Sequence, residues 1–273
     1  MIDSRISESA PSRILCQGTH GGCASCCGVL NHKDRKDVSV WQSQLKAQTH
    51  KVIGAHFEPQ KLIELKEDFQ KENRSQELYS SVKVCPFAGF LDGERLGCLI
   101  HPSRHPQGHD LRHLSVHSQP ICAGHFCASH DWLRPIEMEL INTAHGTFYG
   151  SLVSQPGLVK QLRGCVEDHL GRPLSSKDFQ LAPLAFKEFW EAISQWPYQD
   201  ADPKRFGGFV FIGEEANAQT LSHPNEWFDQ KTHGVWTKAL HELESDLSST
   251  EQAQEALKLL THYVEKLTAP LAS

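Results

Sequence analysis

The chain is 273 residues long, which is enough for one large domain or two smaller ones. Its net charge of -6 argues against a broad basic surface for nucleic acid or anionic lipid, and no apolar run approaches the length that spans a bilayer. The first residues lack the basic and then apolar layout of a secretory signal, so we expect a cytoplasmic protein with neither a nucleic-acid nor a membrane partner.

The N-terminal half is predicted to combine an irregular metal-binding region with two helices. Residues 1–15 are polar and are expected to form a flexible tail. Residues 16–32 are rich in glycine, cysteine and histidine and follow neither a helical nor a strand period, which is typical of a metal-binding loop. Apolar side chains then recur at helical spacing in residues 38–52 and 62–69, so each of these segments is expected to be an amphipathic helix.

Residues 84–130 lose this periodicity again and carry four cysteines and seven histidines. A loop-rich segment of this length is unusual inside a domain unless something other than apolar packing holds it in place. A bound metal would supply that constraint, because its ligands fix the chain where a core cannot. We therefore expect residues 16–130 to form a cysteine-cluster metal-binding domain.

The remainder of the chain is predicted to be a helical C-terminal region, residues 131–273, so that the whole protein is mainly α-helical. A short apolar run at 209–212 is expected to be a strand or a buried loop, and residues 248–251 resemble a capping box before the last helix. Cys165 lies alone on an apolar helical stripe and is expected to be a core residue. Apolar side chains recur at helical spacing in residues 158–166, 186–193, 227–243 and 257–267.

Eight of the nine cysteines fall between residues 16 and 127. In a reducing cytosol such clustered cysteines are more often metal ligands than disulfide partners. Four thiolates satisfy a tetrahedral zinc ion, and four also hold an iron–sulfur cluster. The eight could therefore serve one site with spare thiols, two separate sites or a binuclear centre. Their spacing is Cys16-x6-Cys23-x2-Cys26-Cys27, then Cys85-x12-Cys98, then Cys122-x4-Cys127.

The adjacent pair Cys26 and Cys27 restricts which of these arrangements are possible. The two residues between Cys23 and Cys26 let both thiolates face one ion from a tight turn, which the surrounding glycines permit. The side chains of adjacent residues usually diverge, however, so Cys26 and Cys27 rarely bind one ion without strain. We expect them either to bind two different ions or to send one side chain into the core.

Four pieces of this pattern also occur, in the same order, in a known family. They are Cys23-x2-Cys26-Cys27-Gly28, Cys85-Pro86, Cys98-Leu99-Ile100-His101-Pro102 and Cys122-x4-Cys127. They resemble the YkgJ-type zinc- or iron-chelating proteins, also called the CxxCxxCC family, over about residues 16–130. The resemblance implies chelation of zinc or iron. Some members are similar to flagellin lysine N-methylases, which carry the same cluster, but no further motif in this chain points to that activity.

Two departures from the family pattern bear on the ligand set. The strict CxxCxxCC block would place its first cysteine at position 20, where this chain has His20. Either His20 replaces that cysteine as a nitrogen ligand, or Cys16 reaches in from further away. In addition, residues 103–121 form a longer link than the compact family pattern has.

Histidines recur every four residues between positions 101 and 117. Proline and glycine interrupt the first half of this run, but residues 109–117 could be helical, which would make His113-x3-His117 a metal-chelating pair. The alternative is a polar surface loop whose histidines are solvated. His125 lies inside the closing cysteine pair and is the histidine best placed to join the cysteines.

We predict that the cluster binds zinc, iron or an iron–sulfur cluster and has a structural or chelating role. Two alternatives stay open: a metal-dependent enzyme, methylase-like or with an open coordination position near one of the histidines, and an iron–sulfur redox or sensing protein. The sequence identifies the metal as a partner and names no protein partner. The predicted ligands are Cys16, His20, Cys23, Cys26, Cys27, Cys85, Cys98, Cys122, His125 and Cys127.

Overall fold

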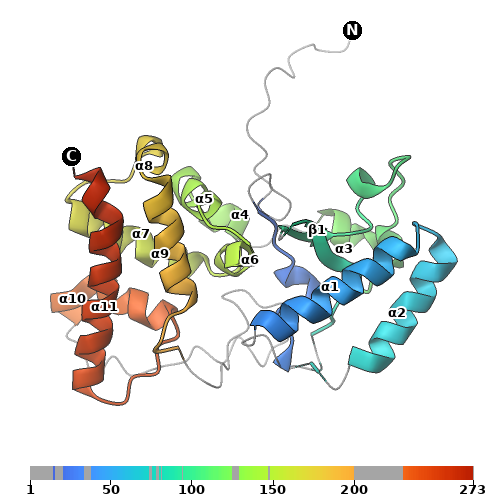
Figure 1. Ribbon diagram of the computed structural model, residues 1–273, viewed down its shortest axis with the longest axis horizontal. Helices are drawn as coiled ribbons and strands as arrows, with labels where there is room; N and C mark the ends of the chain where they lie inside the picture. The colour runs from blue at the N-terminus through green and yellow to red at the C-terminus, as the bar shows by residue number, and fades with distance from the viewer. Residues whose placement is uncertain are drawn as a thin grey trace, which may run out of the picture.

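The computed structural model confirms that the chain is mainly helical over the residues it describes. The helices form two groups: α1, α2 and α3 lie beside a small hairpin at one end of the molecule, and α5 to α11 lie at the other (Figure 1). We call these groups the N-terminal and the C-terminal lobe. The described residues are 15, 21–33, 38–73, 76–77, 80, 82–93, 95–124, 129–146, 148–199 and 230–272.

The two helices predicted for the N-terminal lobe are present as α1 (Val38–Gly54) and α2 (Pro59–Asn73). The segment expected to be loop-rich also contains an antiparallel hairpin of β1 (Ala88–Asp92) and β2 (Arg95–Cys98). No alternation of polar and apolar residues marks this hairpin in the sequence, because consecutive residues of β1 are buried on both faces.

The hairpin is fixed against α1 by buried polar contacts. The Thr49 hydroxyl of α1 accepts a hydrogen bond of 3.0 Å from the backbone N–H of Phe90 in β1. One residue earlier on the same helix, the Gln48 amide donates to the carbonyl of Pro86 at 3.1 Å. Apolar packing completes this lobe in two clusters, whose buried members include Trp41, Leu62, Phe87, Phe90, Leu96 and Ile100.

The histidine-rich link is folded but hardly helical. Of the two possibilities for residues 109–117, the helix does not form: only one 3-10 turn, η4 (Arg112–Leu114), occurs there. The Asp110 carboxylate accepts from the backbone N–H of Arg112 at 3.0 Å, which favours a tight turn over a continuing helix. Around it lie a second 3-10 turn, η3 (Pro102–Arg104), and the short helix α3 (Gln119–Gly124).

The C-terminal lobe is built from the predicted amphipathic helices. Cys165 and its neighbours on α7 are fully buried in one cluster with the apolar faces of α9, α10 and α11, as the stripes predicted. The run at 209–212 and the first part of the 227–243 stripe lie outside the described residues. The helices are α4 (Ser129–Trp132), α5 (Pro135–Asn142), α6 (Phe148–Val153), α7 (Pro156–Leu170), α8 (Ser176–Leu181), α9 (Pro183–Ser194), α10 (Gln230–Glu242) and α11 (Thr250–Thr268).

The last helix begins one residue later than the predicted capping box implies. Ser249 is the N-cap, and its hydroxyl accepts from the backbone N–H of Gln252 at 3.2 Å. The Gln252 side chain in turn accepts from the backbone N–H of Ser248 at 2.7 Å. Gln252 thus reaches one residue further back than in a capping box, because it accepts from Ser248 and not from the N-cap itself.

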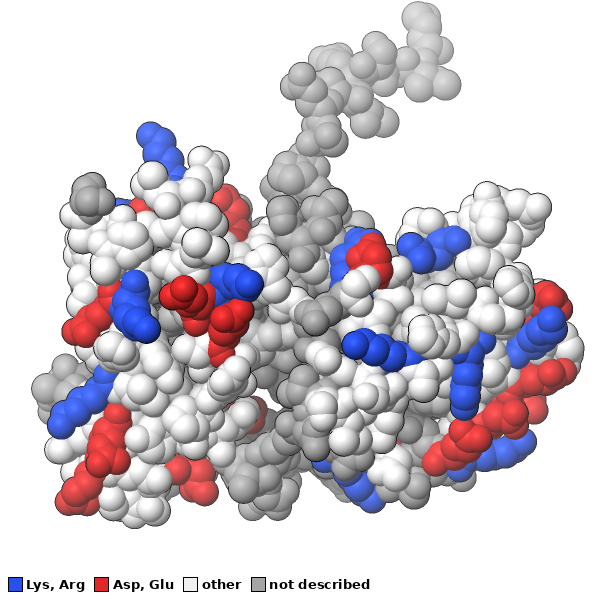
Figure 2. Space-filling view, in the orientation of Figure 1, with Lys and Arg blue, Asp and Glu red and all other residues white. Residues whose placement is uncertain are grey.

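Charges are balanced on the visible surface and inside the C-terminal lobe. On the face in Figure 2, basic and acidic side chains are intermixed over both lobes rather than gathered by sign. Inside, the fully buried carboxylate of Glu137 on α5 is bound by Lys160 at 2.8 Å and Arg163 at 3.2 Å, both from α7. No helix in the described part of the chain has the length and apolar character needed to cross a bilayer.

Candidate metal centre

Six of the ten predicted ligands lie in described parts of the chain, and all six are free thiols. The other four, Cys16, His20, His125 and Cys127, lie outside the described residues. The six are Cys23, Cys26, Cys27, Cys85, Cys98 and Cys122.

The first three cysteines lie on a segment that is packed tightly between the two lobes. A Cβ at Gly22 would lie 1.6 Å from the carbonyl oxygen of Leu96 in β2, and one at Gly21 would lie 2.3 Å from the ring of Tyr149 in α6. The Tyr149 hydroxyl donates to the carbonyl of Leu15 at 3.1 Å, so the last residue of the predicted tail is itself fixed and buried. The glycines thus allow the chain to thread between both lobes just before the cysteines.

A short 3-10 turn, η1 (Ser25–Cys27), presents the adjacent cysteines to different lobes. Cys26 packs against the C-terminal cluster, whereas Cys27 packs against both clusters of the N-terminal lobe. This divergence is the one predicted for neighbouring side chains. Gly28 closes the turn with φ of 78°, where a Cβ would lie 2.4 Å from the carbonyl oxygen of Lys83.

Cys27 is the point at which the separate cysteine segments meet. Its carbonyl accepts a hydrogen bond of 2.8 Å from the backbone N–H of Cys85, which joins the first cysteine segment to the second. Burial raises the pKa of the Cys27 thiol well above its ordinary value, and the charges of Cys85, Cys98, Cys122 and Cys23 raise this pKa further. Four other thiols therefore lie within electrostatic reach of Cys27.

Cys85 and Cys98 begin turns that aim backbone N–H groups at their own sulfur atoms. The Cys85 sulfur accepts from the N–H groups of Phe87, Ala88 and Val116, and the Cys98 sulfur accepts from that of Ile100. Burial raises the pKa of Cys85 to about 11 and that of Cys98 to about 12, and these donors oppose the rise. Donors of this kind stabilise a charged sulfur and tune a metal that it binds.

Cys122 reaches the other thiols from α3, close to a charged pair. Its sulfur lies 3.1 Å from the Ser115 hydroxyl, and its carbonyl accepts from Arg112 Nη1 at 3.0 Å. Arg112 also grips the Asp110 carboxylate through Nε at 2.9 Å and Nη2 at 2.7 Å. The pKa of Asp110 is held well below its usual range, chiefly by this hydrogen bonding from Arg112. The charge of this guanidinium also opposes the rise that burial causes in the pKa of Cys98.

Cys23 is a fifth thiol with a different set of contacts. Its Sγ donates to the carbonyl of Gly150 in α6 at 3.4 Å and lies 3.4 Å from the Ser25 hydroxyl. It is buried in the C-terminal cluster, although its charge reaches Cys27. Cys23 therefore links the cysteine cluster to the C-terminal lobe.

No continuous helix aligns the histidines of the link within the described residues. His101 Nδ1 accepts from the backbone N–H of Ser103 at 3.2 Å, and burial followed by the charge of Arg112 lowers the pKa of His101. His105 and His109 stack with ring centroids 4.6 Å apart. Because the helix that would align His113 with the histidine four residues later does not form, the basis of that predicted chelating pair is missing.

Within the described ranges, no three cysteine, histidine, aspartate or glutamate side chains are arranged so that they could hold an ion as they stand. Neutral thiols do not attract one another, and a metal binds thiolates only after their protons leave. The described cysteines form no disulfide, so the donor set consists of several free thiols. Sulfur donors of this kind are the ligands preferred by zinc, copper(I) and iron–sulfur centres.

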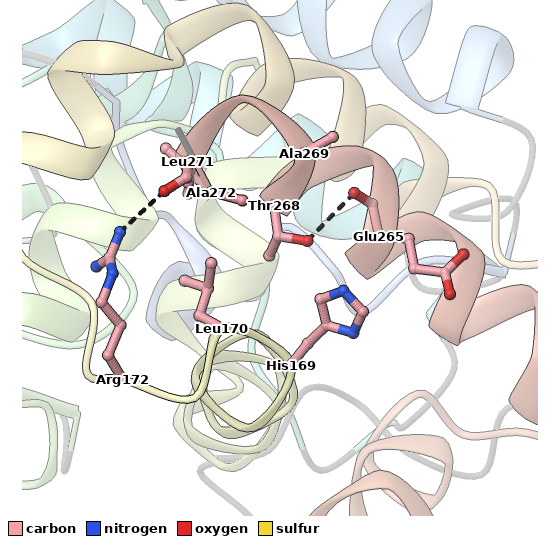
Figure 3. Close-up of a pocket in the computed structure, with 8 residues that line it drawn as sticks. All are labelled: His169, Leu170, Arg172, Glu265, Thr268, Ala269, Leu271 and Ala272. Carbon is pink, nitrogen blue, oxygen red and sulfur yellow. Dashed lines mark hydrogen bonds between the residues drawn. The ribbon is translucent and has the colours of Figure 1, made fainter.

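One small cavity lies beside the cysteines, and a larger hollow lies away from them on the C-terminal lobe. Cys85 lines a small cavity of about 60 Å³ beneath α1. A larger hollow of about 630 Å³ lies on the C-terminal lobe between the ends of α7 and α11, where Arg172 donates to the Leu271 carbonyl and Thr268 to that of Glu265 (Figure 3). This hollow has no cysteine in its lining, so it is separate from the candidate metal centre.

No family model, curated protein or solved structure matches this chain. The resemblance to the YkgJ-type proteins accordingly rests on the order of the cysteines.

Proposed function

We propose that this protein binds a metal through the thiolates of Cys27, Cys85, Cys98 and Cys122, as zinc, iron or an iron–sulfur cluster. The observation that carries the proposal is the meeting of these four thiols, from segments far apart in the sequence, within electrostatic reach of one another. Four thiolates complete a tetrahedral zinc site and also suffice for an iron–sulfur cluster.

The immediate surroundings of the thiols support a metal rather than an ordinary buried core. Backbone N–H groups point at two of the sulfur atoms, and the Arg112 guanidinium lies beside the site. Four thiolates around a divalent metal carry an excess of negative charge, which these donors offset. Uncharged cysteines in an apolar core would gain little from such neighbours.

The role that best fits this arrangement is to hold the irregular part of the N-terminal lobe together. The ligands would tie the turn at Cys27, the two ends of the hairpin region at Cys85 and Cys98, and the short helix that carries Cys122. Metal binding that fixes loops in this way contributes directly to folding free energy. We further propose that the protein is a member of the YkgJ-type family and works in the cytoplasm, where the thiols stay reduced.

The experiment is to purify the full-length chain without oxygen, measure bound zinc, iron and sulfide, and record its absorbance. Brown protein with sulfide-to-iron charge transfer supports the cluster, and colourless protein with one equivalent of zinc supports the zinc site. In the second case cobalt(II) substitution should give intense thiolate-to-cobalt absorption of a four-sulfur tetrahedral site. Metal-free protein that stays fully folded and takes up none of these metals would exclude the proposal.

A further inference from the structure

The element that carries Cys122 is anchored differently from those that carry the other three proposed ligands. Cys27, Cys85 and Cys98 all pack against the apolar clusters of the N-terminal lobe. In α3, by contrast, Cys122 is half-buried and every other residue is exposed, including Ile121 at 52%. An element with so little apolar burial opens locally at low cost.

What holds α3 in place is a set of polar contacts that converge on two residues. Arg112 Nη1 donates to the Cys122 carbonyl at 3.0 Å, while the rest of the same guanidinium binds Asp110 in a two-bonded grip. The Gln119 amide, at the start of α3, donates to the same carboxylate at 3.3 Å. The side chain of Arg112 is 14% exposed, so these charge-assisted contacts are partly shielded from water.

The turn that bears Arg112 is itself firmly anchored. Leu111 and Leu114 are buried in the cluster around α2, and Lys66 of that helix donates to the Leu114 carbonyl at 3.0 Å. Between this turn and α3 the chain passes through Ser118, whose φ of 71° is unusual for a residue with a side chain. The turn at Arg112 is anchored, Ser118 is strained and α3 is held by polar contacts. Together these features allow α3 to move about Ser118 as a hinge.

We propose that Asp110 and Arg112 act as a latch that holds α3 over the metal centre, and that Cys122 is the ligand released when the metal is loaded or passed on. This inference rests on the proposed function, because it concerns one ligand of that site. When the latch opens, the metal–sulfur bond to Cys122 breaks, and its thiolate takes up a proton from water. The incoming ligand is a thiol that loses its proton and forms the replacing metal–sulfur bond.

The proposed exchange is a ligand substitution without oxidation or reduction. The thiolates of Cys27, Cys85 and Cys98 stay bound to the metal while the ligand at the fourth position is exchanged. The acceptor that fits this chemistry is a thiol-bearing molecule able to approach from the exposed side of α3. Arg112 is a positioning residue in this scheme, since it contacts the backbone of the ligand and not the metal.

The test measures how fast the zinc-loaded, full-length protein loses its metal to an excess of a chromophoric zinc chelator. Arg112→Met removes the latch and should speed release about tenfold. Arg112→Lys keeps the charge but cannot grip Asp110 and the Cys122 carbonyl together, so release should also be fast. Arg104→Met is the matched control, because Arg104 also donates to a backbone carbonyl, that of Leu91, but does not contact α3 through it. Zinc release from Arg104→Met should be as slow as from the wild type.

A double-mutant cycle shows whether the effect passes through Cys122. Cys122→Ser should release zinc faster than the wild type, and adding Arg112→Met to it should change the rate no further. An equal acceleration by Arg112→Met in both backgrounds would overturn the latch, as would wild-type release from either Arg112 variant. Arg112→Met also leaves Asp110 without its partner, so it should lower the melting temperature of the metal-free protein alike in both backgrounds. The difference in zinc release between the two backgrounds, rather than the melting, therefore separates a latch from a general structural role. Wild-type protein that binds no metal would instead defeat the proposed function itself.

Discussion

Replacing two buried cysteines by serine, one at a time, separates the metal-binding role from the ordinary cost of changing a core. Cys85 is 6% exposed and is a proposed ligand, whereas Cys165 is fully buried among the apolar residues of α7. Each substitution buries a hydroxyl group in place of a thiol. Without metal, both Cys85→Ser and Cys165→Ser should therefore lower the free energy of unfolding by about 1–3 kcal/mol.

Added metal should then distinguish the two variants. A ligand at a free concentration of 100 times its dissociation constant stabilises the native state by about 2.7 kcal/mol. Cys165→Ser keeps all the proposed ligands, so it should gain as much from metal as the wild type does. Cys85→Ser loses a thiolate that is replaced by a hydroxyl, a poor zinc ligand at neutral pH, and should gain little or nothing.

The assay is equilibrium unfolding in urea under reducing conditions, with and without zinc, for the wild type and both variants. The quantity compared is the zinc-dependent increase in the free energy of unfolding, which cancels the cost that each substitution has in the metal-free protein. An equal increase for Cys85→Ser and the wild type would refute the assignment of Cys85. Loss of the increase in Cys165→Ser would refute its assignment to the core.

Of three further predictions, two concern the segment that leads into the site and the third concerns a charge pair inside the C-terminal lobe. Gly22→Ala should lower the melting temperature markedly, because its Cβ would lie 1.6 Å from the Leu96 carbonyl oxygen, whereas Gly54→Ala, with open space around it, should not. Tyr149→Phe leaves a buried carbonyl without its donor and should cost about 1–3 kcal/mol in chemical denaturation. Asp178→Asn removes a carboxylate whose pKa is lowered to about 2, chiefly by the hydrogen bond from the Arg172 guanidinium. The variant should have a lower melting temperature than the wild type above about pH 4, and this difference should disappear as the pH falls towards 2.

The long helices α7, α9 and α11 were predictable because each buries one continuous stripe, whereas the short helices α4, α5, α6 and α8 carry no such stripe and were not predicted one by one. The stripes on α7, α9 and α11 repeat at helical spacing, and the same side chains form the core of the C-terminal lobe. The hairpin was missed because its strands are short and buried on both faces, which removes the alternation that marks a strand. Spacing alone could not decide between a helix and a loop for the histidine run, because it does not reveal that Asp110 competes for the backbone N–H of Arg112.

Sequence reasoning identified the clustered cysteines as a group, but it could not say which of them meet. The spacing of Cys26 and Cys27 indicates that they diverge; only the packing of both lobes decides that Cys27 is the one that faces the later cysteines. Arg112 carries no motif at all. Its position beside the cluster follows from the anchoring of η4 by Leu111 and Leu114, which is a tertiary property.

The C-terminal lobe contributes to the candidate metal centre without supplying any of its four proposed ligands. Tyr149 and Gly150 of α6 pack against the segment that leads into Cys27, and the Cys23 thiol bonds to the Gly150 carbonyl. The direction in which Cys27 points is thus set from both sides, by β2 and by α6. A substitution on α6 that loosens this contact should weaken metal binding even though it lies in the other lobe, because a ligand that must be ordered on binding costs conformational entropy.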